Sequence, residues 1–228
     1  MMLRVLTWNV HSCIGVDGQV NPDRVRGHIR AISPDIAALQ EVDSRRDRRD
    51  GFDLLGDCLG KAMGNHRAEV RTIRTPDGDY GQMLLSRWPI TDWREHDISY
   101  GAREPRSMIE ATIESELGRI NVLCLHLGLN RRERRQQALK IEALAAADNR
   151  PTVVMGDFNE PTGAGPVARL LARSFSSAGR RRTWPSARPL LPLDRIWFEP
   201  TLRLVRAGVH GDARRASDHL PLWADLRR

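Results

Sequence analysis

Lysine is nearly missing from this chain, although the chain is basic. Only Lys61 and Lys140 occur among 36 basic residues, which outnumber 29 acidic ones and give a net charge of +7. Excess positive charge favours a polyanionic partner or substrate. Arginine in place of lysine, together with many alanines, is also typical of a biased genome composition. Charge alone therefore leaves nucleic-acid binding open.

Cysteine is scarce as well, and the chain has no CxxC spacing. Cys13, Cys58 and Cys124 cannot all pair, and two of them lie in apolar runs. This predicts reduced, buried thiols in a cytoplasmic protein. No cationic segment followed by an apolar run opens the chain, so no signal peptide is expected. No apolar stretch approaches the roughly 20 residues that a membrane-spanning helix needs.

Several widespread catalytic motifs are also absent. The chain has no GxSxG nucleophile elbow, no P-loop, no GxGxxG after a strand and no HExxH. Its cysteine and histidine spacings do not make a tetrahedral zinc site. These absences disfavour the corresponding hydrolase, nucleotide-binding and zinc-dependent chemistries.

The apolar pattern predicts a single α/β domain over residues 1–228. A chain of this length that is 40% hydrophobic can bury one core, and a second domain is not expected. Strand-like runs fall at 3–9, 36–41, 81–86, 107–114, 119–126, 152–157, 194–199, 202–207 and 221–226. Helical patterns fall at 21–32, 51–62, 131–147 and 164–172. Hairpin-like pairs at 107–126 and 194–207 favour mixed sheets packed face to face with helices outside.

Arginines cluster in the predicted helix 131–147 and in two predicted surface loops, 43–50 and 176–192. The first turns of the helix hold Arg131, Arg132, Arg134 and Arg135. Positive charge there is unfavourable to the helix dipole. A solvated face and contacts with an anionic ligand are both open explanations. Arg-rich stretches at 43–50 and 180–182 could follow a phosphate backbone.

Six short polar clusters follow or interrupt apolar, strand-like runs. They are Thr7-Trp8-Asn9-Val10-His11, Leu39-Gln40-Glu41-Val42, Leu125-His126-Leu127, Gly156-Asp157-Phe158-Asn159, Leu193-Asp194-Arg195-Ile196 and Ser217-Asp218-His219-Leu220-Pro221. Strand ends in a packed α/β fold converge on one rim, so we expect one site rich in carboxylate, imidazole and carboxamide groups. Such a site suits a hard cation bound by oxygen, with a phosphate ester beside it.

Each of these residues has an ordinary structural explanation when taken alone. Glu41, for example, could be a surface cap at the end of an apolar strand. Asp157 and Asn159 lie two apart on an extended segment and would face the same side, where they could hold and orient a water. Polar clusters at six predicted strand ends together favour one shared site over six unrelated surface groups.

An ordered set of motifs covers nearly the whole chain, from Thr7 to Leu222. It comprises TWNVH, LQEV, LLSRWPI, EPR, HLGL followed by ERRQ, GDFN, TWPS, LDRIW and SDHLP. One such motif would be weak, but the full set in order resembles the endonuclease/exonuclease/phosphatase superfamily, the metal-dependent phosphoesterases related to DNase I. The resemblance implies a DNase I-like four-layer α/β sandwich, with two mixed β-sheets packed face to face and helices outside.

The resemblance also implies a metal site and a phosphate site. Asn9, Glu41 and Asp218 look like metal ligands, with Glu41 the principal one. This all-oxygen set suits Mg²⁺, with Mn²⁺ able to substitute. The other matching residues would act on the phosphate or the water, namely Arg106, His126, Asp157, Asn159, Asp194 and His219.

In the implied mechanism, water attacks a phosphorus ester in line. Asp157 would activate or position the water, and Asn159 would orient it and the phosphate. Arg106, His126 and His219 would contact phosphate oxygens, and His126 could instead serve the leaving group.

Asp194 is expected to hold His219. Asp194 opens an apolar strand, and a partly buried carboxylate is costly unless it is paired. If the two strands are neighbours, His219 is the natural partner at a hydrogen-bond distance of about 2.6–3.2 Å. The carboxylate would raise the pKa of the imidazole and favour its charged form.

The branch of the superfamily stays open. Leu125-His126-Leu127 stands where the AP-endonuclease branch has Tyr-x-Pro-Asn, which disfavours base-excision repair. We therefore expect a Mg²⁺-dependent phosphoesterase acting on phosphodiester or phosphomonoester bonds, and whether nucleic acid is its substrate stays open. A phospholipid or inositol-phosphate phosphoesterase is the alternative, and a noncatalytic binding domain is the second. A monomer is expected, and the roles of His11, Tyr80 and Tyr100 stay open.

Overall fold

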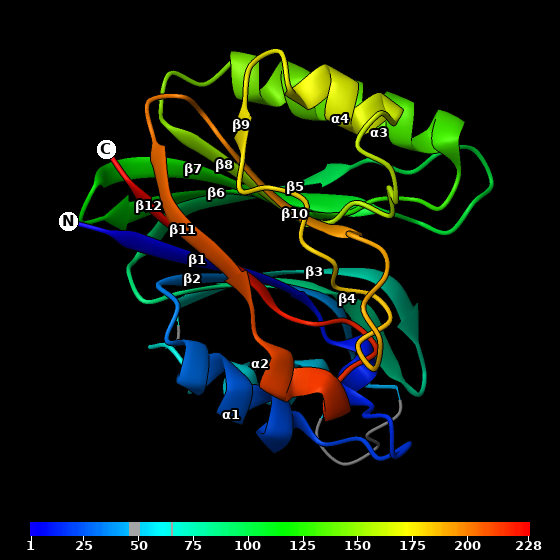
Figure 1. Ribbon diagram of the computed structural model, residues 1–228. Coiled ribbons are helices and arrows are strands. Elements are labelled where there is room, and N and C mark those ends of the chain that lie inside the picture. Colours follow the sequence, from blue (N-terminus) through cyan, green and yellow to red (C-terminus); the bar gives the residue numbers. More distant parts are fainter. Residues whose placement is uncertain (46–50, 65) are drawn as a thin grey trace.

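The structure is a computed structural model that describes residues 1–45, 51–64 and 66–228. Its strands form two mixed six-stranded sheets that face each other (Figure 1). The first sheet has the order β11 (Arg203–Val209), β12 (Leu222–Arg227), β1 (Leu3–Asn9), β2 (Ile36–Asp43), β4 (Gly78–Ser86) and β3 (His66–Thr75). The second has the order β5 (Ile90–Asp97), β6 (Ser107–Ser115), β7 (Gly118–His126), β8 (Thr152–Asp157), β10 (Asp194–Phe198) and β9 (Ser176–Ser177).

Helices cover the outer faces of both sheets, as Figure 1 shows. The first sheet carries α1 (Pro22–Ile32) and α2 (Gly51–Gly60), and the second carries α3 (Arg131–Ala146) and α4 (Pro166–Leu171). This is the expected four-layer sandwich, and the predicted fold class is confirmed. No helix of the described residues is long and apolar enough to cross a membrane.

Strand periodicity divides the buried residues between three apolar layers. On β1, Leu3 and Val5 point into the core between the sheets, whereas Leu6 and Trp8 pack against α1 and α2. Successive strand residues face opposite sides, so a strand covered on both faces is apolar throughout. This is why β1 and β2 are continuous hydrophobic runs.

Besides the two-residue β9, the strands β3 and β5 were not predicted from the sequence. Each lies at the edge of its sheet, where β3 pairs with β4 and β5 pairs with β6. Their sequences, HRAEVRTIRT and ITDWREHD, are rich in charge, and most of the β5 residues are exposed. Charged edge strands discourage pairing with other chains, and they also lack the apolar pattern that identifies buried strands.

The expected hairpin at 194–207 is wrong. Strand β10 pairs with β8 and β9 in the second sheet, whereas β11 pairs with β12 in the first. Every residue of β10 is buried, but Arg203 to Arg206 of β11 are exposed. The chain crosses from the second sheet to the first between these strands. The fully buried β10 fits inside a sheet, whereas the largely exposed β11 fits at a sheet edge.

The two predicted surface loops have more structure than expected. Asp43 ends β2 and is buried, and residues 46–50 of the first loop lie outside the described residues. The second loop contains the short strand β9 and an isolated bridge between Trp184 and Leu191. Arg180, Arg181 and Arg182 are exposed, as expected.

The strand registers bring two sets of three neighbouring strands to one rim. In the second sheet, Asp157 of β8 lies opposite His126 of β7 on one side and opposite Asp194 of β10 on the other. In the first sheet, β1 lies between β12 and β2, so Asn9 has the segment before β12 on one side and Glu41 on the other. The rim joins strand ends from both sheets.

Candidate active site

Asp157 is the point where the two sheets meet at this rim. Its Oδ2 atom lies 3.1 Å from Asn9 Nδ2, 3.6 Å from His126 Nε2 and 3.7 Å from His219 Nε2. The carboxylate is almost fully buried, at 1% exposed. Burial raises the pKa of Asp157 to about 6, with Asp194 adding to the effect and His219 opposing it. The group can therefore accept a proton close to neutral pH.

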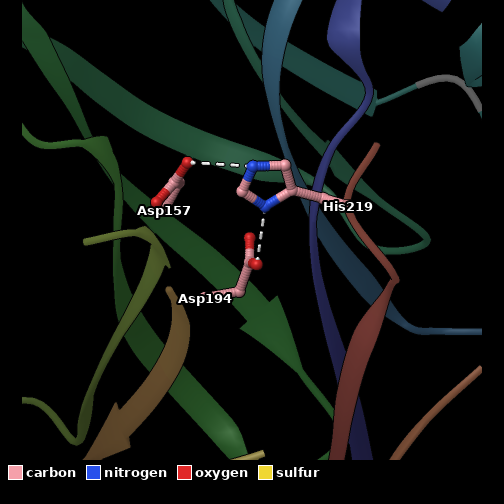
Figure 2. A group of neighbouring side chains, drawn as sticks. All are labelled: Asp157, Asp194 and His219. Atoms are coloured by element: carbon pink, nitrogen blue, oxygen red, sulfur yellow. Dashed lines mark hydrogen bonds and ion pairs between the residues drawn. The ribbon is translucent and has the colours of Figure 1, made fainter. Parts of the chain in front are cut away.

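The expected hydrogen bond between Asp194 and His219 is present. Asp194 Oδ2 lies 2.9 Å from His219 Nδ1, while the opposite ring nitrogen faces Asp157 (Figure 2). Asp194 opens β10 of the second sheet and His219 precedes β12 of the first, so the bond joins the two sheets rather than neighbouring strands of one sheet. Burial alone would lower the pKa of His219, but Asp194 and Asp157 raise it to about 10. The imidazole is thus an imidazolium held between two carboxylates.

Asp157, Asp194 and His219 form a compact buried group. One ligand atom from each lies within 4.8 Å of the others, so the group could bind a metal ion. A protonated imidazole has no lone pair for a metal. The raised pKa of His219 instead favours an ionic group that presents an N–H to an anion.

His126 lies on the other side of Asp157, in different surroundings. It is buried beside Arg106, and among the described residues its ring donates no hydrogen bond to a carboxylate, since Asp157 Oδ2 lies 3.6 Å away. Burial, then the positive charge of Arg106, lowers the pKa of His126 to about 3. The imidazole is neutral at physiological pH. Arg106 Nε is buried and has no hydrogen-bond partner among the described residues, which leaves a donor available beside His126.

Glu41 is placed by a bulge that the sequence did not reveal. Strand β2 continues two residues past it to Asp43, and its register with β4 shifts between Leu39 and Val42. Glu41 has a φ of 55°, a conformation that non-glycine residues rarely adopt. Bulges are frequent beside active sites because they redirect a side chain. Here the bulge turns the Glu41 carboxylate toward Asn9.

Asn9 connects Glu41 with Asp157. Its Nδ2 donates to Glu41 Oε1 at 2.8 Å and to Asp157 Oδ2 at 3.1 Å. Its oxygen accepts the backbone N–H of His11 at 3.0 Å. This orientation differs from that expected of a metal ligand, which would direct the oxygen into the site. Asn9 acts here as a fixed link between two carboxylates.

His11 and Asp218 complete the exposed side of the site. His11 Nδ1 lies 3.5 Å from Glu41 Oε2 and 3.6 Å from Asp218 Oδ1. The hydrogen bond to Glu41 raises the pKa of His11. Burial alone would raise the pKa of Glu41, but His11, His126 and Asn9 together lower it to about 2. Glu41 is therefore ionised, and its side chain is 24% exposed.

Asn159 supports Asp157 through its backbone. Its N–H donates to Asp157 Oδ1 at 2.9 Å, and its side-chain amide donates to the carbonyl of Leu127 at 2.8 Å. A φ of 49° makes this turn possible. The residue lies at the site as expected and also joins β8 to the segment after β7.

Some residues at the site were not assigned a role from the sequence. Trp184 Nε1 donates to Asp218 Oδ2 at 3.2 Å, although Trp184 belongs to the long predicted loop. Ser217 Oγ donates to the carbonyl of Asn9 at 2.7 Å and fixes the segment before β12 against β1. Trp184 belongs to the TWPS motif and Ser217 to the SDHLP motif. This membership was the only sequence evidence that the two residues lie at the site.

The two tyrosines differ in their relation to the site. Tyr80 lines the same small hollow as Arg106 and His126, and the Arg45 guanidinium lies over its ring at 4.9 Å. Burial raises the pKa of Tyr80, so it stays a neutral hydroxyl. Tyr100 is half-buried and joins a turn through its carbonyl, which accepts the N–H of Arg103.

Known proteins share this sequence pattern and fold. The family model described as Endonuclease/Exonuclease/phosphatase family matches residues 6–219. The chain is 30% identical over 251 residues to the "Uncharacterized protein YbhP" of Escherichia coli (strain K12), covering 98% of this chain and 95% of YbhP.

Solved structures with the same fold include a phosphatase and a human catalytic domain. Mannosyl-6-phosphatase Bt3783 of Bacteroides thetaiotaomicron VPI-5482 matches with a TM-score of 0.78 at 17% identity, over 99% of this chain and 100% of that one. The human Nocturnin catalytic domain with a bound sulfate anion matches with a TM-score of 0.76 at 22% identity, over 99% and 94%. At these identities the similarity concerns the fold.

Proposed function

This chain belongs to the endonuclease/exonuclease/phosphatase family, and we propose that it is a Mg²⁺-dependent hydrolase of phosphoric esters, built as one catalytic domain over residues 1–228. Members of the family act on phosphoester bonds. The observation that carries the proposal is the convergence on Asp157 Oδ2 of Asn9, His126 and His219, with the ionised Glu41 alongside.

The charge balance of the site supports a bound cation. Four carboxylates gather there, from Glu41, Asp157, Asp194 and Asp218. The imidazolium of His219 and the guanidinium of Arg106 only partly balance them. A phosphate ester is itself an anion, and a divalent cation beside these carboxylates would offset their repulsion of the scissile phosphate.

Glu41 and Asp218 fit such a cation best. They present partly exposed oxygen donors, which suit a hard ion that keeps some of its water. Asn9 would fix the orientation of Glu41 through its amide N–H. When bound, the ion would neutralise charge that develops on the phosphate oxygens and the leaving group.

The protein's own residues would perform the proton transfer and hold the phosphate. Asp157 would accept a proton from the attacking water as the water oxygen bonds to phosphorus. His219, held by Asp194, would present its charged N–H to a nonbridging oxygen. His126 and Arg106 would bind further phosphate oxygens. The ester oxygen would leave as the bond to phosphorus breaks.

A substrate panel with a metal control tests this proposal. Hydrolysis of bis-p-nitrophenyl phosphate, p-nitrophenyl phosphate, DNA, RNA, phospholipids and inositol phosphates would be measured with Mg²⁺ and with excess EDTA. We expect at least one ester to be cleaved with Mg²⁺ and none with EDTA. Full turnover in excess chelator would rule out the metal mechanism. No turnover on any ester would favour a noncatalytic binding domain.

A matched pair of variants would locate the ion without relying on turnover. Glu41→Gln removes the proposed ligand, and Glu116→Gln makes the same change at an exposed position in the turn between β6 and β7. Mg²⁺ should raise the Tm of the wild type and of Glu116→Gln but not that of Glu41→Gln, because a ligand that binds only the folded state stabilises it. An equal Mg²⁺-induced rise in all three would place the ion elsewhere.

A further inference from the structure

Five arginines line a groove between α3 and α4. Arg131, Arg132 and Arg135 come from the first turns of α3, Arg169 comes from α4, and Arg173 comes from the turn that follows α4. Pro166 and Leu170 complete the lining, and the groove has a volume of about 380 Å³. No acidic side chain is among these lining residues. The groove therefore concentrates positive charge contributed by two separate segments of the chain.

Many arginines elsewhere in the molecule bind carboxylates of the chain. Arg4 binds Asp225 at 2.7 Å, and Arg24 binds Asp17 at 2.7 Å. None of the five groove arginines has an ion-pair partner among the described residues, and all five are exposed. Genome composition can explain how many arginines the chain has. It does not explain why five arginines without a carboxylate partner among the described residues face one groove, where Arg169 Nε donates only to the carbonyl of Ala164.

The position of the groove arginines on α3 is unfavourable to the helix. Positive charge in a first turn opposes the partial positive charge of the helix N-terminus, at a cost of about 0.3–1 kcal/mol for each charge. The only acidic residue of this first turn, Glu133, is buried. A charge pattern that opposes local stability and has no partner points to a ligand outside the chain.

The groove begins at the active-site rim. Helix α3 starts just after His126, through the segment 127–130. Helix α4 is tied to the other side of the site by Glu160, which follows Asn159 and accepts the backbone N–H groups of Val167 at 3.1 Å and Ala168 at 2.8 Å. Figure 1 shows the two helices side by side on the outer face of the second sheet. A substrate that extends past the site in this direction would enter the groove.

We propose that the groove binds the phosphodiester backbone of a nucleic-acid strand whose scissile phosphate lies at Asp157. This proposal rests on the proposed function above. The α3 arginines spread over about 6 Å of helix, and Arg169 and Arg173 add positive charge from a second segment of the chain. The groove can therefore contact the backbone of the strand beyond the phosphate at the site. A small phosphomonoester would leave these arginines unused.

The shape of the groove favours a strand over other polyanionic partners. A membrane surface is flat and meets projecting basic side chains, whereas this surface is concave. The lining contributed by the described part of the chain contains no aromatic side chain, so it offers bases no platform on which to stack. Binding should therefore depend on the phosphate backbone and be indifferent to base sequence.

Binding without hydrolysis tests this proposal. Fluorescence anisotropy of a labelled single-stranded DNA would be measured in EDTA, for the wild type and for Arg132→Ala/Arg135→Ala/Arg173→Ala. We expect binding at least about tenfold weaker for this groove variant at low salt, and a log–log salt slope smaller by about 2. These three side chains are exposed, so the Tm should not fall.

A control variant separates the groove from net charge. Arg203→Ala/Arg227→Ala/Arg228→Ala removes the same charge at the far end of β11 and β12, where Leu226 pairs with Leu3. We expect it to bind DNA like the wild type. Equal weakening of both variants, or no weakening of the groove variant, would overturn the proposal. So would binding to phosphatidylserine vesicles without binding to DNA.

Turnover of a small diester distinguishes the two proposals. The groove variant should hydrolyse bis-p-nitrophenyl phosphate within about twofold of the wild type, because that substrate does not reach the groove. Absence of this hydrolysis in the wild type would contradict the proposed function. The anisotropy result would still decide whether the groove binds DNA.

Discussion

Asp157 separates two imidazoles that lie at nearly equal distances from the same oxygen. His219 on one side is held by Asp194 and has a pKa raised to about 10, despite burial, by its two carboxylate neighbours. His126 on the other side is buried beside Arg106 and has a pKa lowered to about 3. Two residues of one type thus differ in charge at neutral pH.

The difference shows that partners, more than burial, decide the charge of a group at this rim. Both rings are nearly inaccessible, at 7% exposed for His126 and 5% for His219. Burial acts against the charged form in both cases. Only His219 has a bonded carboxylate to offset it. The two sides of the site should therefore respond differently to substitution and to pH.

The largest effect is expected at the residue that the two sides share. Asp157→Asn keeps the shape of the side chain but removes the proton acceptor, so kcat should fall by about 10²–10⁴-fold on the cleaved ester. Steady-state kinetics with Mg²⁺ would measure this, and circular dichroism would check the fold. Turnover near that of the wild type would remove Asp157 from the chemistry.

Removing the carboxylate on the His219 side should lower turnover and move its pH profile. Asp194→Asn takes away the largest influence that raises the pKa of His219, so the alkaline limb of kcat should move to lower pH. Asp194 also raises the pKa of Asp157, so the acid limb should move the same way. We expect kcat to fall by about 10–100-fold at neutral pH. An unchanged profile would contradict the pairing.

A smaller effect is expected on the His126 side. His126→Gln keeps a hydrogen-bond donor in place of a neutral imidazole, so kcat should fall by about tenfold. The alkaline limb should stay in place, because a neutral ring contributes no titration there. A limb that moved as far as in Asp194→Asn would mean that His126 is charged and that the two sides do not differ.

The smallest effect concerns stability. The pKa of His219 is about 10 in the folded protein, above the unfolded value of about 6.5. Protonation of His219 therefore stabilises the folded state in full below about pH 6.5, and this contribution is lost as pH rises toward about 10. The Tm of the wild type should therefore fall by a few degrees more than that of His219→Gln between pH 7 and pH 10. Thermal unfolding by circular dichroism would measure both slopes. Parallel slopes would show that His219 is not protonated in the folded state.

Much of the fold and of the site could be predicted because most strands are short, strongly apolar segments of the sequence. Runs such as Leu3–Asn9 and Thr152–Asp157 end in polar residues, and those residues do gather at one rim. The edge strands β3 and β5 could not be found in this way, because their exposed charged residues lack a buried face. The crossing of the chain between β10 and β11 was missed for a related reason, since two adjacent strands are commonly paired.

The sequence by itself determined the four-layer fold, the family and the residue types at the rim, because hydrophobic periodicity and motifs are properties of short sequence segments. Tertiary structure decided how those residues act. It placed His219 against Asp194 from the opposite sheet, turned the oxygen of Asn9 toward His11, and joined α3 and α4 into one basic groove. Charge state and orientation depend on neighbours that are distant along the chain, and only the packing of the two sheets brings those neighbours together.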